Sequence, residues 1–136
     1  MTRDDLRTGA VIRYQFLWSH EAGRGETEGR KPRPAAVGVR IPRQSGDVLL
    51  LFPITTKRPL ETRFAVEVPE TEKHRAGLDA LTRCWLILDE YNEDAVGRSF
   101  YIDPSPPLGH FSKAFFLPLI KQFVARARKA TRVSRL

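Results

Sequence analysis

Short apolar runs separated by glycine- and proline-rich turns are the feature that most constrains this chain. Among its 136 residues, 10 are proline and 9 are glycine, and they stand mainly between the apolar runs. Strands need only a few alternating or continuous apolar residues, whereas a helix needs a longer periodic stretch without proline in its interior. The pattern therefore predicts many short strands and tight turns within one domain, residues 1–136.

Six runs have the alternation or the β-branched and aromatic content of strands. The turn sequence Ser45-Gly46-Asp47 separates two of them and predicts a hairpin. The predicted strands occupy residues 11–18, 35–41, 48–54, 64–68, 83–88 and 99–102. Between the first two, residues 19–34 are rich in glycine and charge and predict a long mobile loop.

The C-terminal segment 112–130 differs in kind, because its apolar residues recur at the three- and four-residue spacing of an amphipathic helix. Pro118 lacks an amide hydrogen, so the regular helix is predicted to begin there, after a turn or kinked extra turn. Residues 131–136 are predicted to form a basic tail. Strands followed by one helix predict an α+β domain, mainly β: a small barrel of about five to seven short strands with a C-terminal α-helix.

The charge of the chain favours a polyanionic partner. Its 23 Lys and Arg against 16 Asp and Glu give a formal charge of +7 and a pI near 10.1. Residues 61–110 hold 10 acidic and 5 basic side chains, whereas residues 111–136 hold 7 basic and no acidic ones. The asymmetry favours nucleic-acid contact, although a basic segment can also be only a solvated face.

Neither a membrane span nor a secretory leader is expected from this sequence, because no apolar run is long enough. The single cysteine, Cys84, lies in an apolar run and is interpreted as a small buried packing residue that suits a reducing compartment. We therefore expect a cytoplasmic protein without membrane association.

No residue cluster predicts a metal centre. The three histidines lie far apart and only one thiol is present, so zinc has no evident set of ligands. The acidic pairs Asp89-Glu90 and Glu93-Asp94 could hold Mg²⁺, but a polar loop closing a strand is the commoner explanation for adjacent acids. No metal and no cofactor are expected.

The predicted hairpin gathers two side chains with a shared chemistry. If its strands pair, Pro34 and Pro53 lie at the same end, which brings Arg33 close to Thr55. The arginine fork matches phosphate oxygens, and the threonine hydroxyl can donate and accept. RNA supplies its own nucleophile in the 2′-hydroxyl, so such a pair need only align it and stabilise charge on phosphorus. Both residue types are also common at such positions without any function.

The order and spacing of several motifs resemble the MazF/PemK toxins of toxin–antitoxin modules over nearly the whole chain. The Leu88-Asp89-Glu90-Tyr91-Asn92 and Pro107-Leu108-Gly109 segments are similar to the PemK-like branch. The other matching motifs are Trp18 in the opening strand, the glycine-rich loop, Lys31-Pro32-Arg33-Pro34-Ala35-Ala36-Val37, Phe52-Pro53-Ile54-Thr55-Thr56, Glu67-Val68-Pro69, Gly77-Leu78 and the terminal helix.

The resemblance implies an SH3-like β-barrel with a C-terminal helix and a homodimer that cleaves single-stranded RNA without metal, so inhibiting translation and growth. It also implies a cognate antitoxin, for which an acidic, partly disordered tail is expected. By the resemblance, Arg33 and Thr55 are the catalytic residues. Lys31 stands where members often have glycine, which is a departure from their loop pattern. The expected RNA contacts are Glu28, Lys31, Thr56, Lys57 and Asn92.

Two other classes of function stay open. A toxin of the same shape could bind a protein target such as DNA gyrase, or the barrel could bind nucleic acid without cutting it. Trp18 and Trp85 could stack on bases, although their apolar settings favour core packing. The basic side chains near the C-terminus could likewise contact RNA or be merely solvated.

Overall fold

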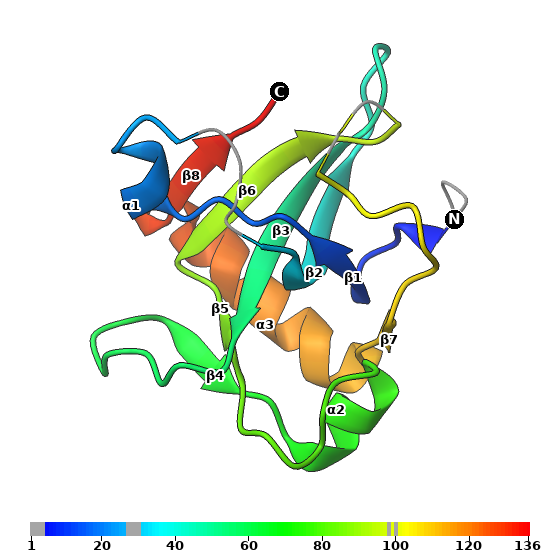
Figure 1. Ribbon diagram of the computed structural model, residues 1–136, viewed down its shortest axis with the longest axis vertical. Helices are drawn as coiled ribbons and strands as arrows, with labels where there is room; N and C mark the ends of the chain where they lie inside the picture. The colour runs from blue at the N-terminus through cyan, green and yellow to red at the C-terminus, as the bar shows by residue number, and fades with distance from the viewer. Residues whose placement is uncertain (1–4, 27–30, 98, 100) are drawn as a thin grey trace.

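The computed structural model describes residues 5–26, 31–97, 99 and 101–136 (Figure 1). It is a small α+β domain, mainly β, in which a curled half-barrel sheet is joined by a C-terminal helix. The structure thus confirms the prediction of an α+β domain, mainly β, with a C-terminal helix. The strands are β1 (Ala10–Tyr14), β2 (Arg33–Ile41), β3 (Val48–Thr55), β4 (Ala65–Glu67), β5 (Trp85–Ile87), β6 (Glu90–Ala95), β7 (Gly109–His110) and β8 (Thr131–Ser134). The helices are α1 (Ser19–Ala22), α2 (Glu70–Arg75) and α3 (Lys113–Arg126), and α3 continues into a 3-10 turn over Ala127–Lys129.

Strand β3 is the centre of the sheet. It pairs with β2 along one side, and on the other side with β6 over its first half and with β5 over its second. The path continues to β4 beyond β5, to β1 and β7 beyond β2, and to β8 beyond β6. The predicted β2–β3 hairpin is confirmed, with Ile41 opposite Val48 and Ala35 opposite Pro53. All named pairs are antiparallel except β6 with β8.

The sheet buries apolar side chains on both faces, because alternate residues of a strand project to opposite sides. On the face that packs against α3, which we call the helix face, Phe52 meets Phe123 with ring centroids 4.7 Å apart. On the other side, which we call the opposite face, Leu49 and Leu51 pack with Ile12 and Tyr14 of β1. Both faces of β3 therefore belong to the hydrophobic core.

A bulge in β2 lets the two layers approach closely. The register between β2 and β3 shifts between Val37 and Val39, on either side of Gly38. A Cβ atom on Gly38 would lie only 2.1 Å from an atom of the Phe52 ring. The missing side chain thus makes room for the aromatic contact between the sheet and α3.

Helix α3 begins five residues before Pro118, which lies inside it, so the prediction that the regular helix starts at the proline is wrong. Ser112 caps the helix, since its hydroxyl accepts a hydrogen bond from the Phe115 amide at 3.2 Å. The Glu72 carboxylate fixes the cap by accepting hydrogen bonds from the amide and the hydroxyl of Ser112, both at 2.8 Å. Phe116, which is 1% exposed, anchors this first turn in the core.

Two predicted irregular segments contain regular structure. Within the predicted loop 19–34, the first residues form α1, and Glu28 lies outside the described residues. The predicted basic tail 131–136 contains β8, which extends the sheet beside β6 (Figure 1). Across the described ranges, none of the helices is both long enough and apolar enough to cross a lipid bilayer.

Candidate functional site

The candidate site lies where β2 and β3 stop pairing. Their ladder ends at Ala35 opposite Pro53, and Arg33 and Thr55 each stand two residues further along in the same direction. Because side chains two residues apart share a face, both residues project on the opposite face. From this point Arg33 pairs with Tyr14 of β1, whereas Thr55 pairs with a residue of β5. The two side chains thus flank the point at which the sheet divides.

The Arg33 guanidinium is supported by an indole ring. Its central carbon lies 5.5 Å from the ring centroid of Trp18, a contact that holds a cation without using its hydrogen-bond donors. Among the described residues, no acceptor reaches the buried Nε of Arg33. Arginine carries five donors in a planar fork, so this guanidinium is positioned and still able to grip an anion.

Thr55 has a fixed hydroxyl at the end of β3. Its Oγ1 accepts a hydrogen bond from the amide of Lys57 at 3.1 Å, within the bend that follows the strand. A hydroxyl that accepts in this way still has its own proton to donate. On the same face, the cross-strand neighbour of Thr55 is Trp85, whose ring carries the guanidinium of Arg83 at 5.0 Å. A second guanidinium thus lies over an aromatic ring in the neighbouring strand, where it donates two hydrogen bonds to Glu67.

Buried polar side chains of β6 hold the segment that carries Trp18. The Asn92 amide pairs with the backbone of Leu17: its oxygen accepts from the Leu17 amide at 2.8 Å, and its nitrogen donates to the Leu17 carbonyl at 2.7 Å. Glu90 accepts a hydrogen bond from the Ser19 amide at 2.5 Å. The backbone is thereby fixed on both sides of Trp18, at Leu17 and at Ser19.

Asn92 has a structural role in place of the predicted RNA contact, because it is fully buried and its amide is engaged. The expectation of a polar loop at Glu90 and Glu93-Asp94 is also wrong, since these residues belong to β6. Along this strand Glu90, Asn92 and Asp94 are buried while their neighbours are less so. In the described part of the chain, no three His, Cys, Asp or Glu side chains gather as metal ligands would.

A polar network next to this segment fixes Tyr14, the strand neighbour of Arg33. The Tyr14 hydroxyl donates to Asp94 at 2.9 Å, and the Ser99 hydroxyl donates to the same carboxylate oxygen at 2.6 Å. Burial, reinforced by the negative charge of Asp94, raises the pKa of Tyr14 far above its ordinary value. Arg135 closes the network: it stacks 3.4 Å from the Tyr101 ring centroid and donates to the Gln15 carbonyl.

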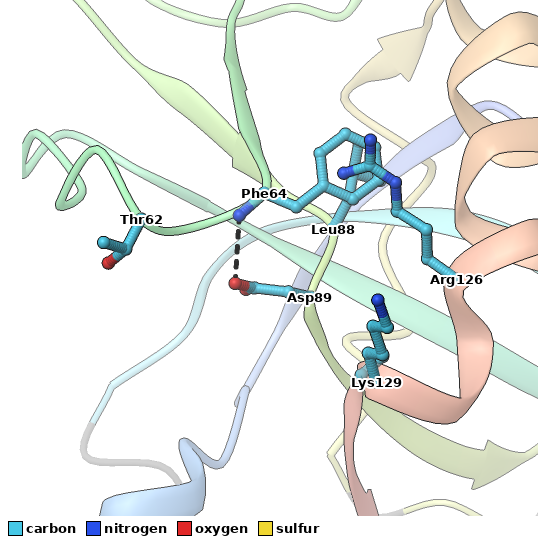
Figure 2. A pocket seen from close by; sticks show the side chains of 7 residues that line it. Thr62, Phe64, Leu88, Asp89, Arg126 and Lys129 are labelled. Atoms are coloured by element: carbon cyan, nitrogen blue, oxygen red, sulfur yellow. Dashed lines mark hydrogen bonds between the residues drawn. The ribbon is translucent and has the colours of Figure 1, made fainter.

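A separate cavity of about 210 Å³ lies at the corner between β4, β5 and the end of α3 (Figure 2). Figure 2 shows Arg126 lying over the ring of Phe64, with a guanidinium-to-centroid distance of 4.5 Å, and Lys129 nearby on the same side. Burial raises the pKa of Asp89, but hydrogen bonds from Arg63 and the Phe64 amide outweigh this effect, and the pKa is lowered overall. This carboxylate is therefore an ionised structural group, and the cavity contains neither Arg33 nor Thr55.

The other predicted contact residues lie around the strand ends. Lys31, Thr56 and Lys57 are exposed and are close in sequence to Arg33 or Thr55. Sequence reasoning did not single out Asp79 or Thr82, although both line a cavity with Thr56. The only sequence signal there is an Asp followed three residues later by Thr, which is a common turn pattern. No family model matches the chain, and a search of the curated proteins finds no significant match.

Proposed function

We propose that this domain is a metal-independent endoribonuclease of the MazF/PemK type, the toxin of a toxin–antitoxin pair, acting in the cytoplasm on single-stranded RNA. In this proposal the half-barrel and terminal helix are an SH3-like barrel, and the toxin is a homodimer. The observation that carries the proposal is the placement of Arg33 and Thr55 on one face where β2 and β3 part.

The proposed reaction uses the substrate's own nucleophile. The 2′-oxygen forms a bond to phosphorus, the bond from phosphorus to the 5′-oxygen breaks, and the proton of the 2′-hydroxyl ends on the departing 5′-hydroxyl. The products are a 2′,3′-cyclic phosphate and a 5′-hydroxyl end. Arg33 would grip the non-bridging oxygens, where negative charge develops, and Thr55 would donate its free proton to the same group.

The charge of the domain supports the proposed partners. With a formal charge of +7, the protein attracts RNA, and the exposed Lys31 and Lys57 add cations beside the pair. An antitoxin with an acidic, partly disordered tail would be attracted to the same surface and would fold on it. Inhibition in this proposal is thus competition between two polyanions for one basic surface.

The test is cleavage of single-stranded RNA by the purified protein in EDTA, with the ends analysed for cyclic phosphate. Arg33→Lys keeps the charge but loses the fork, and Thr55→Val keeps the shape but loses the hydroxyl. We expect each to lower kcat/KM about 100-fold or more. The matched controls are Arg43→Ala, at the far end of the same hairpin, and Thr131→Val on the exposed edge of β8; both should keep full activity.

Two results would contradict the proposal. One is RNA that stays intact with the folded wild-type protein, and the other is full activity of Arg33→Lys or Thr55→Val. Binding of RNA without any turnover would instead support the non-catalytic nucleic-acid-binding class of function.

A further inference from the structure

A second cavity of about 210 Å³ opens at the same strand ends as the candidate catalytic pair, but on the helix face of the sheet. We call it the α2 pocket. Strand ends supply Pro34, Ile54 and Thr56, and the segment after α2 supplies Leu78, Asp79 and Thr82. Pro34 and Thr56 directly follow Arg33 and Thr55 in the chain. For a nucleotide next to a phosphate held by Arg33 to enter this pocket, the RNA would have to turn around these strand ends to the other face of the sheet.

The wall of the α2 pocket is held in place by a buried lysine. Lys73 is only 7% exposed, and its ammonium donates to the carbonyls of Ala80 at 2.9 Å and Thr82 at 3.1 Å. A buried ammonium is costly unless it is well paired, and here its partners are two backbone carbonyls of one loop. These two hydrogen bonds hold the backbone of the loop in place, so the side chains that line the pocket are preorganised.

Asp79 is the charged group of the α2 pocket. Its Oδ1 accepts from the Leu81 amide at 2.9 Å and its Oδ2 from the Thr82 hydroxyl at 2.8 Å. These hydrogen bonds, together with the positive charge of Lys73, lower the pKa of Asp79, so the carboxylate stays ionised at neutral pH. Each oxygen has a second lone pair and can accept one more hydrogen bond.

The lining combines apolar walls with hydrogen-bond acceptors at one edge. Pro34, Ile54 and Leu78 offer surfaces against which a flat ring can pack, and the buried Cys84 adds another apolar contact. Adenine, cytosine and guanine each carry an exocyclic amino group that can donate to a carboxylate. Uracil has no amino group, and the carbonyl oxygens on both sides of its single N–H weaken the hydrogen bond that this N–H can donate to a carboxylate.

We propose that the α2 pocket is a base-recognition subsite for the nucleotide next to the cleaved phosphodiester, and that it selects a base with an exocyclic amino group over uracil. The inference rests on the proposed ribonuclease function and adds the identity of a specificity-determining residue, Asp79. It also assigns Lys73 as a positioning residue that acts through the loop.

The test uses short oligoribonucleotides that differ only in the base on either side of the cleaved bond. Wild-type protein should cleave the best amino-bearing substrate about ten-fold or more faster, in kcat/KM, than the uracil-bearing one. Asp79→Asn should lose or reverse this preference, because an amide can donate to a uracil carbonyl. The matched control is Asp103→Asn, a half-buried Asp that also accepts from a backbone amide two residues later, at 2.7 Å, but lies outside the pocket.

A binding measurement keeps the test independent of the variant's folding. Oligonucleotides with a 2′-deoxy sugar at the cleaved position cannot react, and they can be titrated into the labelled wild-type protein. The amide resonances of Leu81 and Thr82 should shift with the amino-bearing base and shift less with uracil. Wild-type cleavage with a base preference that Asp79→Asn leaves unchanged, or equal shifts with both oligonucleotides, would overturn this inference alone. Wild-type protein that cleaves no RNA would overturn the proposed function as well.

Discussion

The guanidinium of Arg33 lies over the indole of Trp18, 5.5 Å from the ring centroid. This contact joins a residue at the start of β2 to a segment held by β6, two parts of the chain that share no strand pairing. It explains how an arginine next to solvent can be oriented while its donors are kept for a ligand.

Loss of the indole should weaken the grip of Arg33 on phosphate. Trp18→Ala should lower the affinity for an uncleavable oligonucleotide about two- to five-fold, because an aromatic support is worth about 0.5–1 kcal/mol. Trp18→Phe keeps a ring and should keep most of the affinity. Phe64→Leu serves as control, since it breaks a similar stack, with Arg126 at 4.5 Å, outside the site. Equal affinities for Trp18→Ala and wild type, measured by titration, would contradict the role.

Removing the Asn92 side chain should destabilise the whole domain. Asn92→Ala leaves the amide and the carbonyl of Leu17 without their partner inside the protein. Two unsatisfied buried groups predict a loss of about 3 kcal/mol in the free energy of unfolding, measured by urea denaturation. Gln122→Ala, an exposed amide on α3, should change it by less than about 0.5 kcal/mol. Similar losses for both variants would show that Asn92 is no anchor.

The ion pair of Asp89 with Arg63 predicts how the free energy of unfolding depends on pH. The pKa of Asp89 is lowered in the folded protein, so its contribution is complete above the unfolded value of about 4 and is lost as the pH falls through the folded value. Asp89→Asn should therefore cost about 1 kcal/mol at pH 7 and much less near pH 2. Urea unfolding at several pH values measures the gap between the two curves. A gap that stays constant down to pH 2 would rule out the linkage.

Local patterns predicted the elements whose partners lie nearby in the chain. The hairpin of β2 and β3 follows from two apolar runs around one turn, and α3 follows from its periodicity. Strand β6 could not be predicted in this way, because its alternating Glu90, Asn92 and Asp94 are polar and are buried only against partners far along the chain. Tyr14, for example, binds Asp94 across 80 residues.

In the candidate site, too, the residues brought together by local pairing could be predicted, and those held by distant partners could not. Arg33 and Thr55 could be predicted because a single hairpin brings them to one end. The support from Trp18 and the pocket at Asp79 could not, since each depends on a loop fixed by a distant or buried polar side chain. β8 was missed for a related reason: its sequence has one buried apolar residue, Val133, and its place is set by pairing with β6.

Strand β3 exchanges one neighbour for another along its length: β6 pairs with Val48–Leu51 and β5 with Ile54 and Thr55, while β2 pairs on the other side as far as Pro53. To free β3, three separate ladders have to open together, whereas β7 or β8 can leave at the cost of one. Slow amide exchange should therefore concentrate in Val48–Leu51 of β3, which has a partner strand on both sides, rather than at Thr55, which pairs with β5 alone. The end of the hairpin that carries the proposed catalytic pair is thus attached to the last part of the protein to melt.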